Sequence, residues 1–536
     1  MQHDPKHDSK TDDAWRTAAR SRPIQVLGAA MVACAVLATS AIANANVVES
    51  TTTTLAETVT TVETKADKAA DKLERKLNRA VKSKDRLSWS FSTTQAVDPA
   101  TLGEVSSVIG ADVVRAAGHD GSGVDIAVID TGIAPVAGLD GTDKVVNGPD
   151  LSLDFQAGAP VGVDAFGHGT HMASIAANSE DGIAPGARLV NLKVGAVDGA
   201  VDVSQVIAAI DWAVQHRNTD GLNIRVINLA FGTDSVQAAE LDPLSHAVES
   251  AWRNGVVVVV SAGNSGGALD MPAVNRHVLA VGAYDTDDPT KAWDDDVPDF
   301  TARAKSWSDR APDLVAPGVS ILGLRVPGST VDVENPQATY EERWLKGTGT
   351  SQAAAVVSGA VALLLDARPE LTPDQVKALL TSSADRFLLV STRTQGAGRL
   401  DLDDAVTRPT PTTSQTHPAS TGLGSIDAAR GTYTLVAEDG TELSGEVDLQ
   451  GAPWVPTTWA PLSSSASAWT GGTWNGSEWA DVDWTTAAEL SGIDWTARTW
   501  RARTWRARTW RADLWAGSDW SGRSWKGRTW RIESAG

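Results

Sequence analysis

A nearly unbroken run of β-branched residues, V-V-V-V-V-S-A at 256–262, most constrains how this chain can fold. Such a run is typical of a strand buried on both faces, which occurs mainly in parallel sheets covered by helices on two sides. Similar apolar segments lie at 124–130, 189–194, 226–231 and 277–283, and stretches with helical patterning, such as Val203 to His216 and Pro243 to Asn254, lie between them. For residues 101–406 this alternation predicts an α/β fold, a mostly parallel sheet with helices on both faces.

The composition sets limits on size and on partners. At about 100–200 residues per domain, 536 residues allow three or four units. A hydrophobic fraction of 42% is enough for a core, and the net charge of −21 argues against a nucleic-acid partner. Phosphate contacts need a positive surface, so we interpret the acidity as a contribution to solubility.

The N-terminal region has the pattern of a secretory signal. An apolar stretch from Ile24 to Ala43 follows several arginines and ends in the small residues A-I-A-N-A at 41–45. Residues 1–45 are therefore predicted to be a signal peptide, and the protein to be secreted. An uncleaved signal anchor is the alternative, because about 20 apolar residues span a bilayer. A membrane is a predicted partner only if this N-terminal segment stays uncleaved. The single cysteine, Cys34, allows neither a disulfide framework nor a zinc cluster.

Three further regions flank the predicted α/β domain. Residues 46–100 are predicted to be a pro-segment or linker with an amphipathic helix, because Leu73, Leu77 and Val81 recur at helical spacing. Residues 407–450 form a Pro/Thr-rich linker and a β-hairpin signal at Asp439–Gly440. Residues 451–536 form a low-complexity or β-rich tail in which tryptophan recurs mostly every five residues.

The tryptophan tail has two interpretations that the sequence leaves open. Exposed tryptophan faces stack on sugars, and arginines between them add cation–π contacts, so the tail is a possible binder of cell-envelope glycan. Alternatively, it is a low-complexity tract expanded by duplication, as the near-verbatim repeats of T-W-R-A-R from 499 to 512 indicate. A spacing of five matches neither the helical period nor the strand period.

Three short segments each place a reactive side chain beside glycine. They are I-D-T-G with Asp130, G-H-G-T-H with His168 and G-T-G-T-S-Q with Ser351. Asp130 ends a predicted strand, and the other two open predicted helices, so an open α/β sheet brings all three to its carboxyl edge. A serine hydroxyl needs an adjacent base, which His168 supplies while Asp130 fixes the imidazole tautomer.

A fourth polar residue belongs to the same edge. Asn264 lies in S-A-G-N-S-G-G, directly after the valine-rich strand. Its side-chain amide is placed to donate to a tetrahedral oxyanion beside the backbone N–H of Ser351, where the N-terminal dipole of the helix adds to the effect.

Residues from about 105 to 406 resemble the catalytic domain of the subtilisin-like serine protease family. The matching stretches are I-D-T-G at 129–132, G-H-G-T-H at 167–171, S-A-G-N at 261–264, A-P-D-L-V-A-P-G at 311–318, G-T-S-Q-A-A at 349–354 and G-A-G-R-L-D at 396–401. The resemblance implies that Asp130, His168 and Ser351 are the catalytic triad and Asn264 the oxyanion-hole donor.

The resemblance further implies a serine endopeptidase that hydrolyses polypeptides through an acyl-enzyme on Ser351. Two edges would grip an extended peptide by strand addition, and they comprise Gly199, Ala200 and Val201 on one side and Ala230, Phe231 and Gly232 on the other. Ala355, Val356, Met172, Ser174 and Ala230 depart from the family pattern, which affects specificity more than the reacting groups. The alternative function is a cell-surface or glycan-binding protein in which this domain is only a scaffold.

No metal-binding residue is predicted. His171 lies three residues from His168, but without a third ligand it is interpreted as a packed structural histidine. Calcium takes carboxylate oxygens, and a solvated acidic loop is the preferred interpretation of the cluster Asp285, Asp287, Asp288, Asp294, Asp295 and Asp296. The chemistry needs no cofactor, and the resemblance allows a structural calcium ion.

Overall fold

The computed structural model describes residues 99–156, 160–286, 296–306, 309–412, 414–432, 434–437, 442–480 and 500–502. The chain divides into two compact units, Met1–Ser90 and Phe91–Gly536, and all described residues belong to the second unit. The predicted signal segment, the predicted pro-segment except for its last two residues, and most of the tryptophan tail therefore lie outside the described residues.

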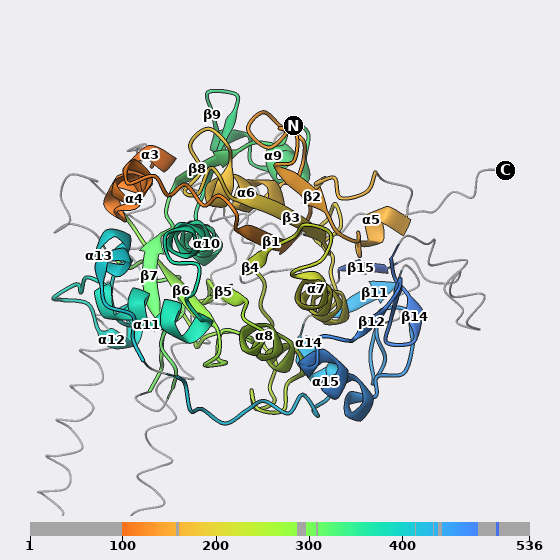
Figure 1. Ribbon diagram of the computed structural model, residues 1–536. Coiled ribbons are helices and arrows are strands. Elements are labelled where there is room, and N and C mark those ends of the chain that lie inside the picture. The colour runs from red at the N-terminus through yellow and green to blue at the C-terminus, as the bar shows by residue number, and fades with distance from the viewer. Residues whose placement is uncertain are drawn as a thin grey trace, which may run out of the picture. The chain divides into compact units, whose positions relative to one another are not determined.

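A seven-stranded sheet forms the centre of this unit, in the order β2-β3-β1-β4-β5-β6-β7 (Figure 1). Every neighbouring pair in it is parallel. Its strands are β1 (Asp125–Asp130), β2 (Val145–Asn147), β3 (Arg188–Lys193), β4 (Ile224–Leu229), β5 (Val257–Ser261), β6 (Leu279–Tyr284) and β7 (Leu314–Pro317).

Both faces of the sheet are buried, as the β-branched runs predict. In β5, Val257 and Val259 enter one hydrophobic core, whereas Val258 and Val260 enter the other. Successive side chains of a strand point to opposite faces, so an all-apolar strand needs cover on both sides. The predicted α/β fold with a parallel sheet is confirmed.

Helices supply that cover. The face that contains Val258 packs against α7 (Val203–His216) and α8 (Pro243–Arg253). The opposite face packs against helices that include α3 (Leu102–Val108), α4 (Ala111–Ala116), α6 (His168–Ala177), α10 (Thr350–Ala367), α11 (Pro373–Ser383) and α13 (Leu402–Thr407). Helix α10 is the only helix among the described residues that is long and apolar enough to cross a membrane, and 89% of it is buried, which identifies it as a core helix.

A small antiparallel sheet in the order β8-β10-β9 precedes α10. Its strands are β8 (Ile321–Leu324), β9 (Thr339–Tyr340) and β10 (Trp344–Gly347). The short helices around the two sheets are α5 (Leu153–Gln156), α9 (Thr330–Glu334), the 3₁₀ helix η2 (Pro336–Ala338) and α12 (Thr392–Gln395). Strand β10 leads directly into the turn before Ser351, so this sheet positions the start of α10.

Residues 426–480, here called the C-terminal segment, continue the fold beyond the predicted linker. Their elements, with a short strand from farther along the chain, are α14 (Ile426–Arg430), β11 (Leu435–Ala437), α15 (Pro456–Ser464), β12 (Trp469–Thr470), β13 (Thr473–Trp474), β14 (Ser477–Glu478) and β15 (Trp500–Ala502). Strand β11 pairs with β15. The turn of the predicted hairpin lies outside the described residues, although Leu443 N–H donates to Leu435 O at 2.8 Å.

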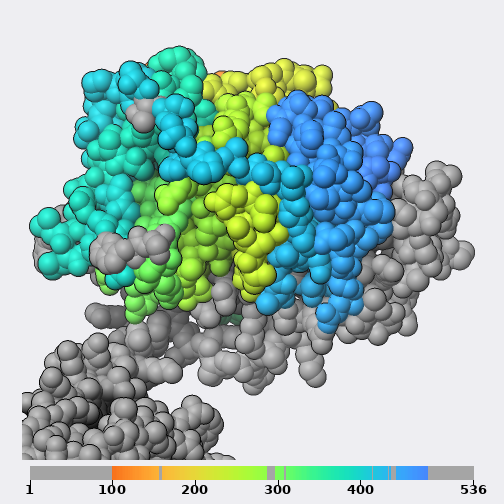
Figure 2. Space-filling view, turned by 90° about the horizontal axis from the view of Figure 1, so that it is seen from below, coloured from red at the N-terminus to blue at the C-terminus, as the bar shows by residue number. Residues whose placement is uncertain are grey.

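The tryptophans of the C-terminal segment are buried rather than exposed. They are Trp454, Trp459, Trp469, Trp474 and Trp479, each at most 4% exposed. They join the same core as α7 and α8, and Figure 2 shows the segment (blue) seated against the yellow and green residues of the sheet domain. These five rings therefore differ from the exposed faces that the glycan interpretation requires. The later tryptophans, apart from the backbone of Trp500, lie outside the described residues.

Candidate active site

Asp130 is the last residue of β1, and its carboxylate holds His168. The two carboxylate oxygens lie 2.8 and 2.9 Å from His168 Nδ1, and both side chains are buried. Thr131 N–H donates to Asp130 Oδ1 at 2.7 Å, which fixes the carboxylate at the strand end. A carboxylate at Nδ1 selects the tautomer with its proton on that nitrogen, so Nε2 is the basic atom of the ring.

His168 is the first residue of α6, and the start of this helix depends on a residue that the sequence analysis missed. Asp164 accepts hydrogen bonds from Gly167 N at 2.7 Å, Thr170 N at 2.8 Å and Thr170 Oγ1 at 2.7 Å. Burial raises the pKa of Asp164, and the charge of Lys193 and these hydrogen bonds oppose that rise. An aspartate four residues before the histidine, ahead of a helical pattern, was the available signal for this cap.

A buried lysine supports the turn after Asp130. Lys193 is the register partner of Asp130 on β3. Its ammonium donates to Thr131 O at 2.7 Å and Gly195 O at 2.9 Å and lies 2.9 Å from the buried carboxylate of Asp154. A buried charge needs a partner and further hydrogen bonds, and Lys193 has both. It thus holds the backbone that presents Asp130.

Asn264 and Ser351 are linked through Thr350. Asn264 Oδ1 accepts from both Thr350 N and Thr350 Oγ1 at 2.9 Å, and Gly263 N–H donates to Thr350 Oγ1 at 3.2 Å. Ser351, the next residue, is the second residue of α10. Because the Asn264 oxygen faces Thr350, the amide nitrogen, which lies in the same plane about 120° from the oxygen around Cγ, points in a different direction. The orientation suits a donor role for Nδ2.

Close packing of α6 against α10 brings the Asp130–His168 pair and the Asn264–Ser351 pair to the same edge of the sheet. Helices α6 and α10 contact each other directly, and a Cβ on Gly359 of α10 would lie only 2.7 Å from the carbonyl oxygen of Ala176. A Cβ on Gly347, just before Ser351, would lie 2.7 Å from His171 Nε2. Glycine is therefore required at both contacts. The first turn of α6 thus lies against the loop that opens α10.

His171 is a packed side chain. Burial, with a smaller effect from His168, lowers the pKa of His171 to about 3, so the ring is neutral. No group of three or more His, Cys, Asp or Glu side chains in the described part of the chain is arranged to hold a metal ion. Of the acidic cluster, Asp285 and Asp296 are described and pair through their backbones, and the other four members lie outside the described residues.

The two predicted peptide-gripping edges follow β3 and β4, the neighbours of β1 on either side. Residues Gly199–Val201 close a turn in which Ala200 N–H donates to Asp198 Oδ1 at 2.9 Å and Ala200 O accepts from Ala196 N at 3.0 Å. Gly199 has a φ of +81° and packs against the ring of Phe166. On the other edge, Ala230 and Phe231 are buried and Gly232 is partly exposed.

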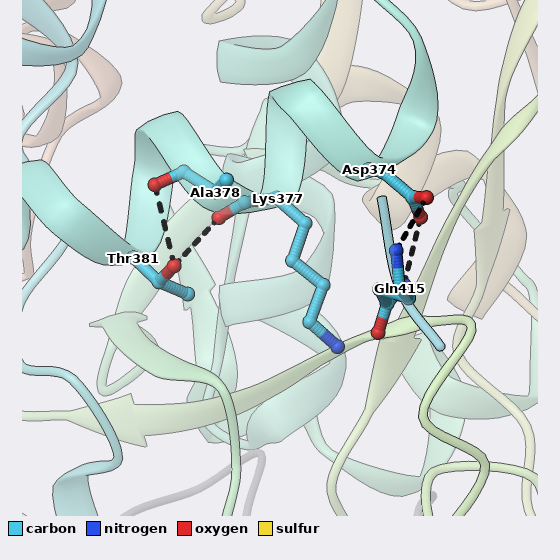
Figure 3. Close-up of a pocket in the computed structure, with 5 residues that line it drawn as sticks. All are labelled: Asp374, Lys377, Ala378, Thr381 and Gln415. Atoms are coloured by element: carbon cyan, nitrogen blue, oxygen red, sulfur yellow. Dashed lines mark hydrogen bonds between the residues drawn. The ribbon is translucent and has the colours of Figure 1, made fainter. Parts of the chain in front are cut away.

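A pocket lined by none of these residues lies on α11 (Figure 3). Asp374, Lys377, Ala378, Thr381 and Gln415 line it. Lys377 donates to Val278 O at 2.8 Å and Arg276 O at 2.9 Å and lies 2.9 Å from Asp313 Oδ1. Burial lowers the pKa of this lysine to about 8 despite the Asp313 charge. Lys377 thus joins α11 to the start of β6, and we assign the pocket no part in the chemistry.

The comparisons with known proteins identify the family. The sequence profile of the subtilase family matches residues 121–398. The chain is 34% identical to serine protease AprX of Bacillus subtilis over 301 residues, covering 53% of this chain and 66% of AprX. It is 34% identical to subtilisin DY of Bacillus licheniformis, covering 52% of this chain and 89% of that protein, and 32% identical to subtilisin Savinase of Lederbergia lenta, covering 54% and 92%.

A crystal structure of a cold-adapted subtilisin-like serine proteinase is also similar, with 28% identity, coverage of 53% of this chain and 89% of that one, and a TM-score of 0.41. The profile match extends over more than half of the chain and includes Asp130, His168, Asn264 and Ser351. The chain belongs to the subtilase family and is a serine endopeptidase.

Proposed function

We propose that Ser351 is the nucleophile, His168 the general base and Asp130 the residue that orients the imidazole. The observation that carries this proposal is the buried pair of contacts, at 2.8 and 2.9 Å, from the Asp130 carboxylate to His168 Nδ1. A serine hydroxyl is a weak nucleophile until an adjacent base accepts its proton. Nε2 is the ring atom that this arrangement makes basic.

The steps follow from those roles. Ser351 Oγ attacks the scissile carbonyl carbon while its proton passes to His168 Nε2. The tetrahedral intermediate then collapses, the C–N bond breaks, and the imidazolium gives its proton to the leaving amine. Water, deprotonated by the same ring, attacks the ester and releases the carboxylic acid, and the proton returns to Ser351. The proton transfers in these steps are between Ser351, His168, the leaving amine and one water molecule.

Asn264 is proposed to stabilise the oxyanion together with the backbone N–H of Ser351. Its oxygen is held by Thr350, which leaves the amide nitrogen as the donor end. The start of α10 adds the positive end of a helix dipole. For one such donor, the effect known from subtilisin itself is about 3–4 kcal/mol, or roughly 10²–10³ in kcat.

The substrate is proposed to be a polypeptide bound as an added strand between Gly199–Val201 and Ala230–Gly232. Both backbone groups of Ala200 are used inside its own turn. Gly199 N–H is also used there, since it donates to Ala196 O at 2.8 Å, so the gripping groups proposed for that edge are the carbonyl of Gly199 and the backbone of Val201.

Three finer proposals rest on the sequence alone. The stretch from Ile24 to Ala43 supports export of the protein, with cleavage near Ala45 or retention as an anchor. The tryptophans from Trp484 onward support glycan binding by the end of the tail, which a pull-down of full-length and truncated protein on cell walls tests. A structural calcium ion needs several oxygen ligands, and the acidic sequence at 285–296 is the region to examine for it.

A fluorophosphonate probe tests the assignment of the nucleophile. The wild-type protein should be labelled at Ser351, as found by peptide mapping, and Ser351→Ala should take no label. Ser358→Ala is a matched control on the same helix, because Ser358 Oγ donates to Asn228 Oδ1 at 3.0 Å inside the core. Labelling that survives in Ser351→Ala would overturn the assignment.

A further inference from the structure

Helix α14 contacts the chain directly after each of the two proposed peptide-gripping edges. Asp202 follows Gly199–Val201, and Thr233 follows Ala230–Gly232. Both of these residues bond to α14, a five-residue helix of the C-terminal segment. One short helix thus bonds to the residue that follows each of the two proposed peptide-gripping edges.

The contact on the first side is a buried ion pair. Arg430 Nε donates to Asp202 Oδ1 at 2.7 Å, Nη2 lies 3.4 Å from Oδ2, and neither side chain is exposed. Asp202 also caps α7 by accepting from Ser204 N at 3.0 Å. Arg430 Nη1 donates to Gly445 O at 3.0 Å, so the guanidinium is held from the other side as well. A planar guanidinium held at several points fixes direction as well as distance.

The contact on the second side is a buried hydroxyl. Thr233 Oγ1 donates to Ala429 O at 2.7 Å. The backbone of Thr233 pairs in both directions with Met271, at 2.8 Å each. Beyond it, Thr432 donates through its backbone N and its hydroxyl to Asp234, each at 2.7 Å. The second edge is therefore held between β4 and a fixed point on α14.

We propose that α14 is a positioning clamp that sets the separation of the two edges and thereby raises the affinity for extended peptides over small acyl substrates. Strand addition between two edges needs both at hydrogen-bonding distance from one inserted chain, because such bonds weaken steeply with distance and angle. A buried ion pair adds little net stability compared with apolar residues, whereas the hydrogen bonds of a guanidinium constrain the direction of the contact. This inference rests on the proposed function, because it assumes that these two edges bind the substrate.

The test uses the full-length protein with two variants of the clamp. Thr233→Val removes the hydroxyl and keeps the shape. Asp202→Asn combined with Arg430→Met removes both charges and keeps an oxygen to cap α7. Gln215→Met is the matched control, because Gln215 bonds the C-terminal segment to α7 through Trp469, with two bonds of 2.9 Å, at a position away from the edges.

Three quantities are measured for each protein: KM and kcat for a fluorogenic peptide with at least four residues before the scissile bond, kcat/KM for p-nitrophenyl acetate, and the rate of fluorophosphonate labelling. Loss of one hydrogen bond corresponds to roughly threefold to tenfold in an equilibrium constant. We expect KM for the peptide to rise about threefold in Thr233→Val and about tenfold or more in the double variant. The ester and probe rates should stay within about twofold of wild type.

Each of the other outcomes would contradict the proposal that α14 positions the two edges. Equal losses for peptide and ester would mean that α14 supports the fold of the catalytic residues only. An unchanged peptide KM in Thr233→Val would exclude the clamp even if the double variant fails to fold. An equal rise of KM in Gln215→Met would show general loosening instead of positioning. If the wild-type protein reacts with the probe but the peptide KM is the same in the clamp variants, the proposed function holds and the clamp proposal is wrong. If the wild-type protein reacts with neither probe, ester nor peptide, both the proposed function and the clamp proposal are wrong.

Discussion

Asp211 links the C-terminal segment to α7, and its replacement by alanine provides a quantitative test of that link. Trp459 Nε1 and Trp474 Nε1 donate to Asp211 Oδ2 at 2.8 and 2.9 Å, and Ser463 Oγ donates to Oδ1 at 2.6 Å. All four side chains are buried. Asp211→Ala therefore leaves three buried donors without an acceptor.

The size of the effect follows from those three donors. Each buried unsatisfied donor costs about 1–3 kcal/mol, and contributions within one cluster do not add fully, so we expect the free energy of unfolding to fall by about 4 kcal/mol. Asp211→Asn should cost only about 1–2 kcal/mol, because the amide oxygen can accept from both indoles while its nitrogen donates to Ser463 Oγ.

Urea unfolding followed by tryptophan fluorescence measures these differences, and limited proteolysis locates them. Undocking of the segment should expose new cleavage sites in residues 407–425 before the sheet domain unfolds. Asp299→Ala is the control, because that carboxylate is 81% exposed and lies 3.4 Å from the guanidinium of Arg303. The reasoning is refuted if Asp211→Ala unfolds within about 1 kcal/mol of this control.

Three further predictions concern catalysis and pH. Asp164→Ala removes the cap of α6, so kcat should fall at least tenfold with KM nearly unchanged in steady-state assays, whereas a change in KM alone would contradict this role. Asn264→Ala should lower kcat roughly 10²–10³-fold, the range known from subtilisin, and an effect below about threefold would exclude an oxyanion contact. Burial opposes ionisation of Glu249, but hydrogen bonds from His277, Ser420 N and Arg253 outweigh it and lower its pKa to about 2. Its stabilisation, roughly 3 kcal/mol for this change in pKa, is therefore present above pH 4.5 and lost as the pH falls toward 2, so unfolding of Glu249→Gln should depend less on pH over that range.

The sheet and helices α7 and α8 on one of its faces were predictable because their residues carry a single strong signal. A valine-rich strand buries side chains on both of its faces, so it is stable only between two apolar layers. The sequence therefore predicts a strand at 256–262, and β5 is found at Val257–Ser261. Helix α7 has the predicted bounds, because Asp202 and Gln205 form a capping box at its start. The short edge strands β2 and β7 were missed, because three or four residues carry too little periodicity.

The arrangement of the C-terminal segment could not be predicted, because the same five-residue tryptophan spacing occurs in different elements, with Trp459 in helix α15 and with Trp469 and Trp474 in strands. Strands β12 and β13 are joined by Gly471–Gly472, which places Trp469 directly opposite Trp474, five residues later. Asn475–Gly476, both with positive φ, makes the next turn and places Thr473 opposite Glu478. The Gly471–Gly472 hairpin thus makes Trp469 and Trp474 cross-strand neighbours, an arrangement that the pattern of a single helix or strand does not predict.

The contacts among candidate site residues were predictable only in part. The glycine-flanked motifs predict Asp130, His168, Asn264 and Ser351 as site residues, but Lys193, which supports the turn after Asp130, lies far from it in sequence. Asp164 was the exception with a local signal, four residues before His168. The ion pair between Arg430 and Asp202 spans 228 residues and leaves no pattern in either segment.

The central claim is that Asp130, His168 and Ser351 act as one unit, and kinetic non-additivity tests it most directly. kcat/KM for one peptide is measured for Ser351→Ala, His168→Ala and the triple variant with Asp130→Ala. In subtilisin itself, removal of the serine or the histidine lowers kcat on the order of 10⁶-fold, about as much as removal of all three groups. We predict the same pattern here, with the triple variant no worse than Ser351→Ala. Losses that multiply from one variant to the next, or a Ser351→Ala protein with wild-type activity, would contradict the account.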